Sequence, residues 1–193
     1  KRSSRLAPYR IETLVTLRKG ARWVEFETKI NNNVPNHYLQ AAFPTDVDAE
    51  FVYAQGQFDV VKRPIAKPDY SKYDEIPMTE QPMNSFVDIC NENEGAAILN
   101  TGLKAYESDD DYNHTVYLSL LRCFELRIYV TPEEQNYSRI ENGSQSFGEH
   151  TFRYAFMPHK GDWEDAQVWK AAEDFNMEIL IGQTAPTEHG ISQ

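Results

Sequence analysis

Histidine and cysteine side chains, from which metal sites and many nucleophilic active sites are built, are dispersed along this chain. No histidine has a second histidine or a cysteine three or four positions away, and the cysteines form no C-x-x-C pair. The G-x-S-x-G, P-loop and G-x-G-x-x-G patterns are also missing. We therefore expect no catalytic residue and no metal site within the chain, and two buried free thiols. The residues concerned are His37, His114, His150, His159 and His189, with Cys90 and Cys123.

Carboxylates are plentiful, and three of them are adjacent at Asp109, Asp110 and Asp111. A pair of carboxylates on the two sides of a glycosidic bond can hydrolyse it. Adjacent aspartates in front of a strand also form solvated turns, which is the simpler interpretation here. Spacing alone does not choose between the two.

A single arginine stands in an otherwise apolar strand pattern. In residues 116–128 alternate positions are apolar except for Arg122, and a guanidinium on an apolar face needs a partner. Either a β-bulge near Cys123 turns Arg122 outward, or its aliphatic stem lies along the core while the charge pairs with a carboxylate. The apolar positions are Val116, Leu118, Leu120, Phe124, Leu126 and Ile128.

Most of the chain up to residue 158 has the alternation that is typical of β-strands. Residues 10–17 and 22–30 alternate apolar and polar side chains around the Gly-containing turn RKGAR, which predicts a β-hairpin. Turn-prone residues separate the further segments, as in a β-sandwich. The other predicted strands are 37–43, 50–55, 58–63, 85–90, 95–100, 116–130 and the stretch SFGEHTFRYAFMPH.

Two regions depart from this pattern. Residues 64–83 carry four prolines and little periodicity, so we expect a long loop that is either functional or simply solvated. From Asp162, the expected N-cap, the spacing of apolar residues changes to that of a helix, which we expect to have about four turns. Its apolar stripe is expected to consist of Val168, Ala172 and Phe175, joined by Trp169. Trp163 and His159 are expected to pack the turn before this helix.

The overall composition limits the class of partner. Nineteen basic and 30 acidic residues give a net charge of −11, which disfavours nucleic acid and anionic membranes. No apolar run approaches the roughly 18 residues of a membrane span, and residues 1–10 lack the core of a signal peptide. We expect a cytoplasmic protein. Residues 1–193 are expected to form one β-sandwich domain cut from something longer, since a strand pattern begins at Glu178 with no turn to receive it.

The chain also resembles a known family over about residues 10–176. The segments KGARWVEFETKINN, AAFPTDV, QFDVVKRP, PMNSFVDI, GAAILNTGLKAYE, VYLSLLR and HTFRYAFMPHKGDW occur in that order. Together they resemble the C-terminal β-domain of glycoside hydrolase family 38, the α-mannosidases, most closely its bacterial branch, which includes mannosylglycerate hydrolases. The last segment, read as F-x-Y-A-F-M-P-H-x-G-D-W, is the most specific.

The resemblance implies an all-β, galactose-mutarotase-like antiparallel sandwich with one helix on its C-terminal side. It implies that the chain works with its own N-terminal catalytic domain on an α-mannoside or glycan. That domain would hold the zinc and the aspartate nucleophile of a retaining enzyme, so the isolated chain is expected to lack activity. An arginine of this β-region approaches the substrate in the family, and Arg122 matches it best. The alternative function is a carbohydrate-binding module without catalysis.

Overall fold

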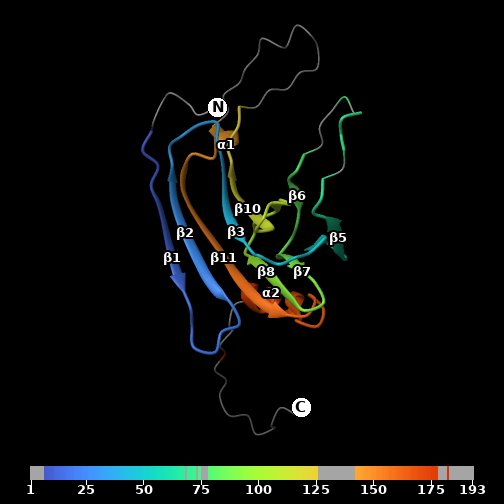
Figure 1. The fold of residues 1–193 in the computed structure, drawn as a ribbon. Coiled ribbons are helices and arrows are strands. Elements are labelled where there is room, and N and C mark those ends of the chain that lie inside the picture. Colours follow the sequence, from blue (N-terminus) through green and yellow to red (C-terminus); the bar gives the residue numbers. More distant parts are fainter. Residues whose placement is uncertain are drawn as a thin grey trace.

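The computed structural model describes residues 7–67, 69–72, 74, 78–125, 142–177 and 182, with only the backbone of residue 142. Within them the chain forms two antiparallel sheets packed face to face and a helix on the outer side of the larger sheet (Figure 1). The predicted all-β sandwich with one helix towards its C-terminal end is therefore confirmed. None of its described helices is long and apolar enough to cross a membrane.

The larger sheet has seven strands in the order β1-β2-β11-β8-β7-β4-β5. These strands are β1 (Ile11–Thr16), β2 (Val24–Asn32), β11 (Gly148–Lys160), β8 (Glu94–Asn100), β7 (Phe86–Cys90), β4 (Phe51–Gln55) and β5 (Val60–Pro64). The smaller sheet has the order β3-β10-β9-β6. Its strands are β3 (Tyr38–Pro44), β10 (Thr115–Arg122), β9 (Ala105–Ser108) and β6 (Gln81–Pro82). The helices are α1 (Asn142–Gln145) and α2 (Val168–Asn176).

The predicted hairpin is confirmed as β1 and β2, which pair from Ile11 opposite Ile30 to Thr16 opposite Glu25. The turn that joins them contains Gly20 at a φ of 80°, a left-handed conformation that costs glycine little.

Strand β11 connects the two layers of the core because its side chains alternate between two apolar environments. Tyr154 points between the sheets, stacks on Phe26 at 5.4 Å between ring centroids, and its hydroxyl lies 2.7 Å from Thr28 Oγ1. Ala155 and Met157 point the other way, towards α2. The core between the sheets is formed chiefly by Val52, Ala54, Val87, Ile89, Ile98, Tyr106, Val116, Leu118 and Tyr154.

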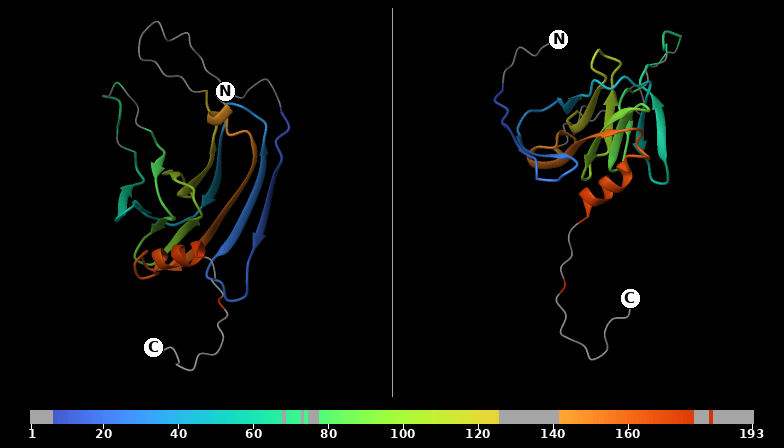
Figure 2. Two further views of the ribbon diagram at one scale, coloured as in Figure 1. Left: turned by 180° about the vertical axis from the view of Figure 1, so that it is seen from behind. Right: turned by 60° about the horizontal axis from the view of Figure 1, so that its bottom comes forward.

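Helix α2 covers the outer face of the larger sheet, against β7 and β8 (Figure 2). Val168, Ala172 and Phe175 are buried there as predicted. Two details of the prediction were wrong. The helix begins at Val168 because Asp162 caps only the preceding turn, accepting a hydrogen bond from the Asp165 N–H at 2.8 Å, and Trp169 stays 43% exposed.

Other predicted elements differ at their ends. Strand β10 ends at Arg122, and residues 126–130 of the predicted strand lie outside the described residues. The strand pattern from Glu178 also lies outside them. Within the described part of the predicted loop 64–83 the chain forms a short strand, β6, which pairs with β9. Neither β6 nor β9 had been predicted.

Candidate functional site

Arg122 lies just beyond a β-bulge in β10. The register of β10 against β3 shifts between Ser119 and Leu121, so one residue is extra. Before the shift Leu118 faces the core, and after it Leu121 and Cys123 face inward. Arg122 is thereby turned outward, with its side chain 50% exposed. The bulge that we considered is present, although it lies before Arg122 and not at Cys123.

The guanidinium of Arg122 is held by a carboxylate from the predicted loop. Its Nη1 donates to Oε2 of Glu80 at 2.6 Å, and the Glu80 side chain is only 12% exposed. The other oxygen of Glu80, Oε1, accepts the hydroxyl of Tyr38 at 2.7 Å. Both alternatives for Arg122 therefore hold in part: it is turned outward, and it pairs with a carboxylate.

Tyr38 acts as a neutral hydrogen-bonding group at this site. Burial raises the pKa of its phenol to about 12, with Glu80 and Glu107 adding to the effect of burial and the Ser119 hydroxyl opposing it. Gln40 Nε2 donates to the same phenol oxygen at 3.0 Å. The phenol is therefore protonated at neutral pH, and its O–H donates a hydrogen bond to Glu80.

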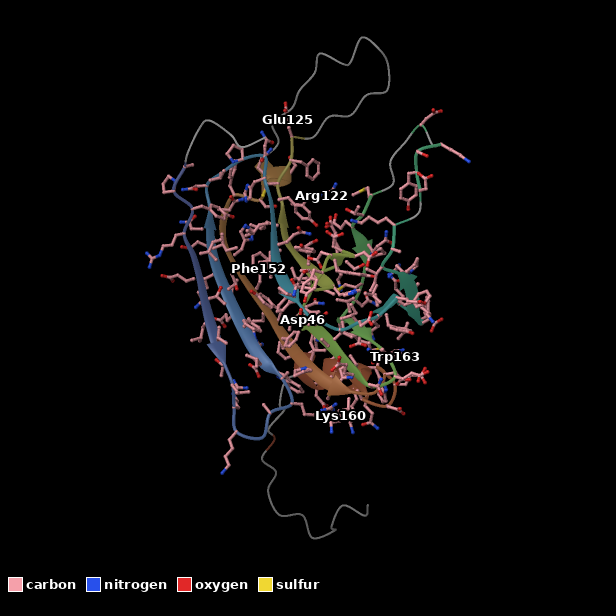
Figure 3. The ribbon with its side chains drawn as sticks, in the orientation of Figure 1. Asp46, Arg122, Glu125, Phe152, Lys160 and Trp163 are labelled. Carbon is pink, nitrogen blue, oxygen red and sulfur yellow. The ribbon has the colours of Figure 1, made fainter. Side chains whose placement is uncertain are left out.

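These residues line an open hollow of about 700 Å³ at the end of the smaller sheet, where β3 begins and β10 ends. Figure 3 shows Arg122 and Glu125 at this end, above Phe152 and far from Trp163. The hollow combines a cation, carboxylates, a phenol and the half-exposed ring of Phe124. Among the described residues its lining includes Asn36, His37, Tyr38, Met78, Thr79, Glu80, Glu107, Arg122, Cys123, Phe124 and Glu125.

The thiol beneath the hollow is not a nucleophile. Burial raises the pKa of Cys123, so the unreactive thiol dominates at neutral pH. His37 Nε2 lies 3.9 Å from Cys123 Sγ and 3.2 Å from the Tyr9 hydroxyl. Cys90 and Cys123 are both buried and free, as predicted.

The three adjacent aspartates form a turn, as in the simpler interpretation. Asp111 accepts the backbone N–H of Thr115 at 2.8 Å and its hydroxyl at 2.7 Å, and these bonds lower the pKa of Asp111. Asp109 pairs with Lys67 at 3.2 Å. Each bond fixes the turn before β10, and none of these residues lines the hollow of Arg122.

A second pair of charged groups is buried under the turn that precedes α2. Nε2 of His159 lies 2.8 Å from Oδ1 of Asp88, and the two side chains are 5% and 0% exposed. Trp163 packs over Phe86 and Tyr53 in the same region. The prediction that His159 and Trp163 pack this turn is confirmed, but the carboxylate partner of His159 was missed. The sequence could have suggested it, since Asp88 is the one charged residue of the buried strand 86–90.

This pair predicts a pH dependence of stability. Burial alone lowers the pKa of His159. The hydrogen bond and charge of Asp88 raise this pKa by more than burial lowers it, so the net shift is upward. A raised pKa in the folded state stabilises the fold below the unfolded pKa of about 6.5, and this contribution is lost as pH rises through the folded pKa. The free energy of unfolding measured in urea should therefore contain a contribution that falls between pH 5 and 9. His159→Gln should lack this contribution. If His159→Gln has the same dependence of stability on pH as wild type, the idea that His159 and Asp88 form an ion pair in the folded state is wrong.

Among the described residues no group of three or more histidine, cysteine or acidic side chains could hold a metal ion. The described part of the chain is thus a β-sandwich with Arg122 in the hollow at the end of its smaller sheet, and its described residues form no group of metal-ligating side chains. A domain of this kind can shape a site or bind a ligand.

Comparison with known proteins identifies the class. Residues 3–125 match the family model of the glycosyl hydrolases family 38 C-terminal domain, which is more than half of the chain. The chain therefore belongs to this family, and the expected resemblance is confirmed. At the level of the family the chain corresponds to the C-terminal domain of these glycosyl hydrolases.

Individual relatives agree with this assignment. A protein of Halalkalibacterium halodurans, provisionally named a mannosylglycerate hydrolase, is 29% identical over 95% of this chain and 19% of its own length. Human alpha-mannosidase 2C1 is 28% identical over 89% of this chain and 14% of its own length. The crystal structure of an alpha-mannosidase from Enterococcus faecalis V583 superposes with a TM-score of 0.76 at 30% identity, covering 91% of this chain and 19% of that one. The chain spans less than a fifth of the length of each of these relatives.

Proposed function

We propose that residues 1–193 form the C-terminal β-sandwich domain of a retaining α-mannosidase, and that Arg122 lines its substrate pocket. The observation that carries this proposal is the position of Arg122. It stands at the mouth of an open hollow, half-exposed, with its guanidinium fixed by Glu80. The open hollow of about 700 Å³ beside this charge leaves room for a ligand.

The chemistry of the hollow suits a sugar. A guanidinium has five N–H donors, and the bond to Glu80 occupies only part of this set, so others can donate to sugar hydroxyls. The carboxylates can accept hydrogen bonds from the same hydroxyls. The half-exposed ring of Phe124 offers an apolar surface for the C–H face of a pyranose.

The bond cleavage itself belongs, in this proposal, to the protein's own N-terminal catalytic domain. That domain would supply the carboxylate nucleophile of a retaining mechanism and a zinc site, for which the described residues offer no ligand set. The β-domain would pack against it and complete the pocket wall. Two buried free thiols fit a reducing compartment, which supports a cytoplasmic location. The substrate would be an α-mannoside, either a mannosylglycerate or a glycan.

The alternative is a carbohydrate-binding module, which is favoured by the hollow that the described residues of this chain form by themselves. The two functions differ in what the isolated chain does. We expect the chain alone to show no hydrolysis of 4-nitrophenyl α-mannoside and no saturable mannose binding by titration calorimetry, because the catalytic walls of the pocket are missing. Saturable binding by the folded chain would favour the module, and hydrolysis would contradict both functions.

A further inference from the structure

From the charges of the hollow we infer that it selects an uncharged sugar and rejects substrates whose anionic group enters it. This inference rests on the proposed function of Arg122. It concerns a choice that the proposed function leaves open, between a neutral mannoside and one that carries a carboxylate or phosphate.

Hydrogen bonding gives the first reason. Arg122 is already paired with Glu80 at 2.6 Å, and Glu80 also accepts the Tyr38 hydroxyl. A sugar hydroxyl can accept a bond from Arg122 and donate one to a carboxylate, so it joins this network without breaking it. A carboxylate ligand can also accept from the remaining N–H donors of Arg122, but it has no proton to donate to the carboxylates of the hollow, so it faces them with like charge.

The net charge gives the second reason. Arg122 and Glu80 neutralise each other, and two further acidic residues, Glu107 of β9 and Glu125, line the same hollow. Within the described ranges Glu107 has no ion pair, so its charge is not compensated locally. Two like charges about 6 Å apart at a partly screened surface repel enough to weaken binding about tenfold. The whole chain, with a net charge of −11, adds to this repulsion.

The test uses the full-length enzyme that carries this chain and a matched pair of substrates, 4-carboxyphenyl α-mannoside and its neutral methyl ester. We expect wild type to prefer the ester by about tenfold in kcat/KM at low ionic strength, and salt to reduce this preference. Glu107→Gln should shift the ratio towards the carboxylate substrate by about five- to tenfold. Glu92→Gln, which removes an exposed carboxylate from the distant β7–β8 turn, is the control and should not move the ratio.

The outcomes separate the two claims. If wild type prefers the carboxylate substrate, the charge selection is wrong. It is also wrong if Glu107→Gln leaves the ratio of kcat/KM values unchanged. In both cases the proposed function stands as long as Arg122→Met lowers kcat/KM for both substrates. If Arg122→Met changes neither substrate, the proposed function fails and this inference fails with it. A ratio that moves with Glu107→Gln but not with Glu92→Gln supports charge selection.

Discussion

Replacement of Arg122 by methionine in the full-length enzyme should lower kcat/KM for an α-mannoside by about 100-fold. Methionine keeps an unbranched apolar stem but removes every N–H donor. Hydrogen bonds from a charged group contribute about 1.5–3 kcal/mol each, and a loss of about 2.7 kcal/mol corresponds to a 100-fold change. Steady-state kinetics with 4-nitrophenyl α-mannoside measure this effect.

The same substitution should change stability little. Arg122 is 50% exposed, and Glu80, which is 12% exposed, keeps its hydrogen bond from Tyr38 when the cation is lost, so the substitution should cost about 1–2 kcal/mol. Thermal unfolding should therefore change by only a few degrees. Arg153→Met is the matched control, because Arg153 lies on the outer face of the larger sheet, 5.5 Å from the ring of Phe175. A loss of folding as large as the loss of activity would show that Arg122 is structural.

The local features of the fold follow from the sequence alone. Alternation in residues 10–17 and 22–30 predicts the hairpin, although only β2 has a buried face and the residues of β1 stay largely exposed. The apolar stripe of α2 is likewise predicted by the spacing of its apolar residues. The first residue of α2 is not predicted correctly. Asp162 and the acidic residues after it have the composition of a first helical turn, but here they form a separate turn before the helix.

The orientation of Arg122 could not be predicted, because the alternation of residues 116–128 continues unbroken through the bulge. Only the pairing of β10 with β3 creates the extra residue between Ser119 and Leu121. The partner of Arg122 is also non-local. Glu80 is 42 residues away, in a loop that the sequence marks as unusual without indicating which of its side chains matters.

The largest effect on stability is expected at Gly95, whose importance the sequence around it does not indicate. Gly95 lies in β8 opposite Cys90 of β7 and His159 of β11. A Cβ at this position would lie 2.6 Å from both Cys90 Cβ and His159 Nε2, and closer still to His159 Cε1. The imidazole cannot swing away freely because Asp88 holds it in a buried layer. The glycine is therefore needed for space.

Gly95→Ala should accordingly lower the free energy of unfolding by about 3 kcal/mol, at the upper end of the cost of overpacking a core. For a domain of this size this corresponds to a fall in Tm of about 9 °C. Gly143→Ala is the matched control, because a Cβ there meets nothing within 4 Å, and it should be close to neutral. Equal stability of the two variants would contradict the steric argument.

The pH dependence of the same variant separates two ways in which the strain could be relieved. If the added methyl group displaces His159, the contact with Asp88 is lost, and the stability of Gly95→Ala should no longer carry the contribution that falls as pH rises through the pKa of His159. Its profile should then match that of His159→Gln. If the strands move apart and the pair survives, the wild-type pH dependence should persist at lower stability. Because Asp88 fixes the ring by a bond of 2.8 Å and Cys90 Cβ is attached directly to the backbone, we expect the strands to move.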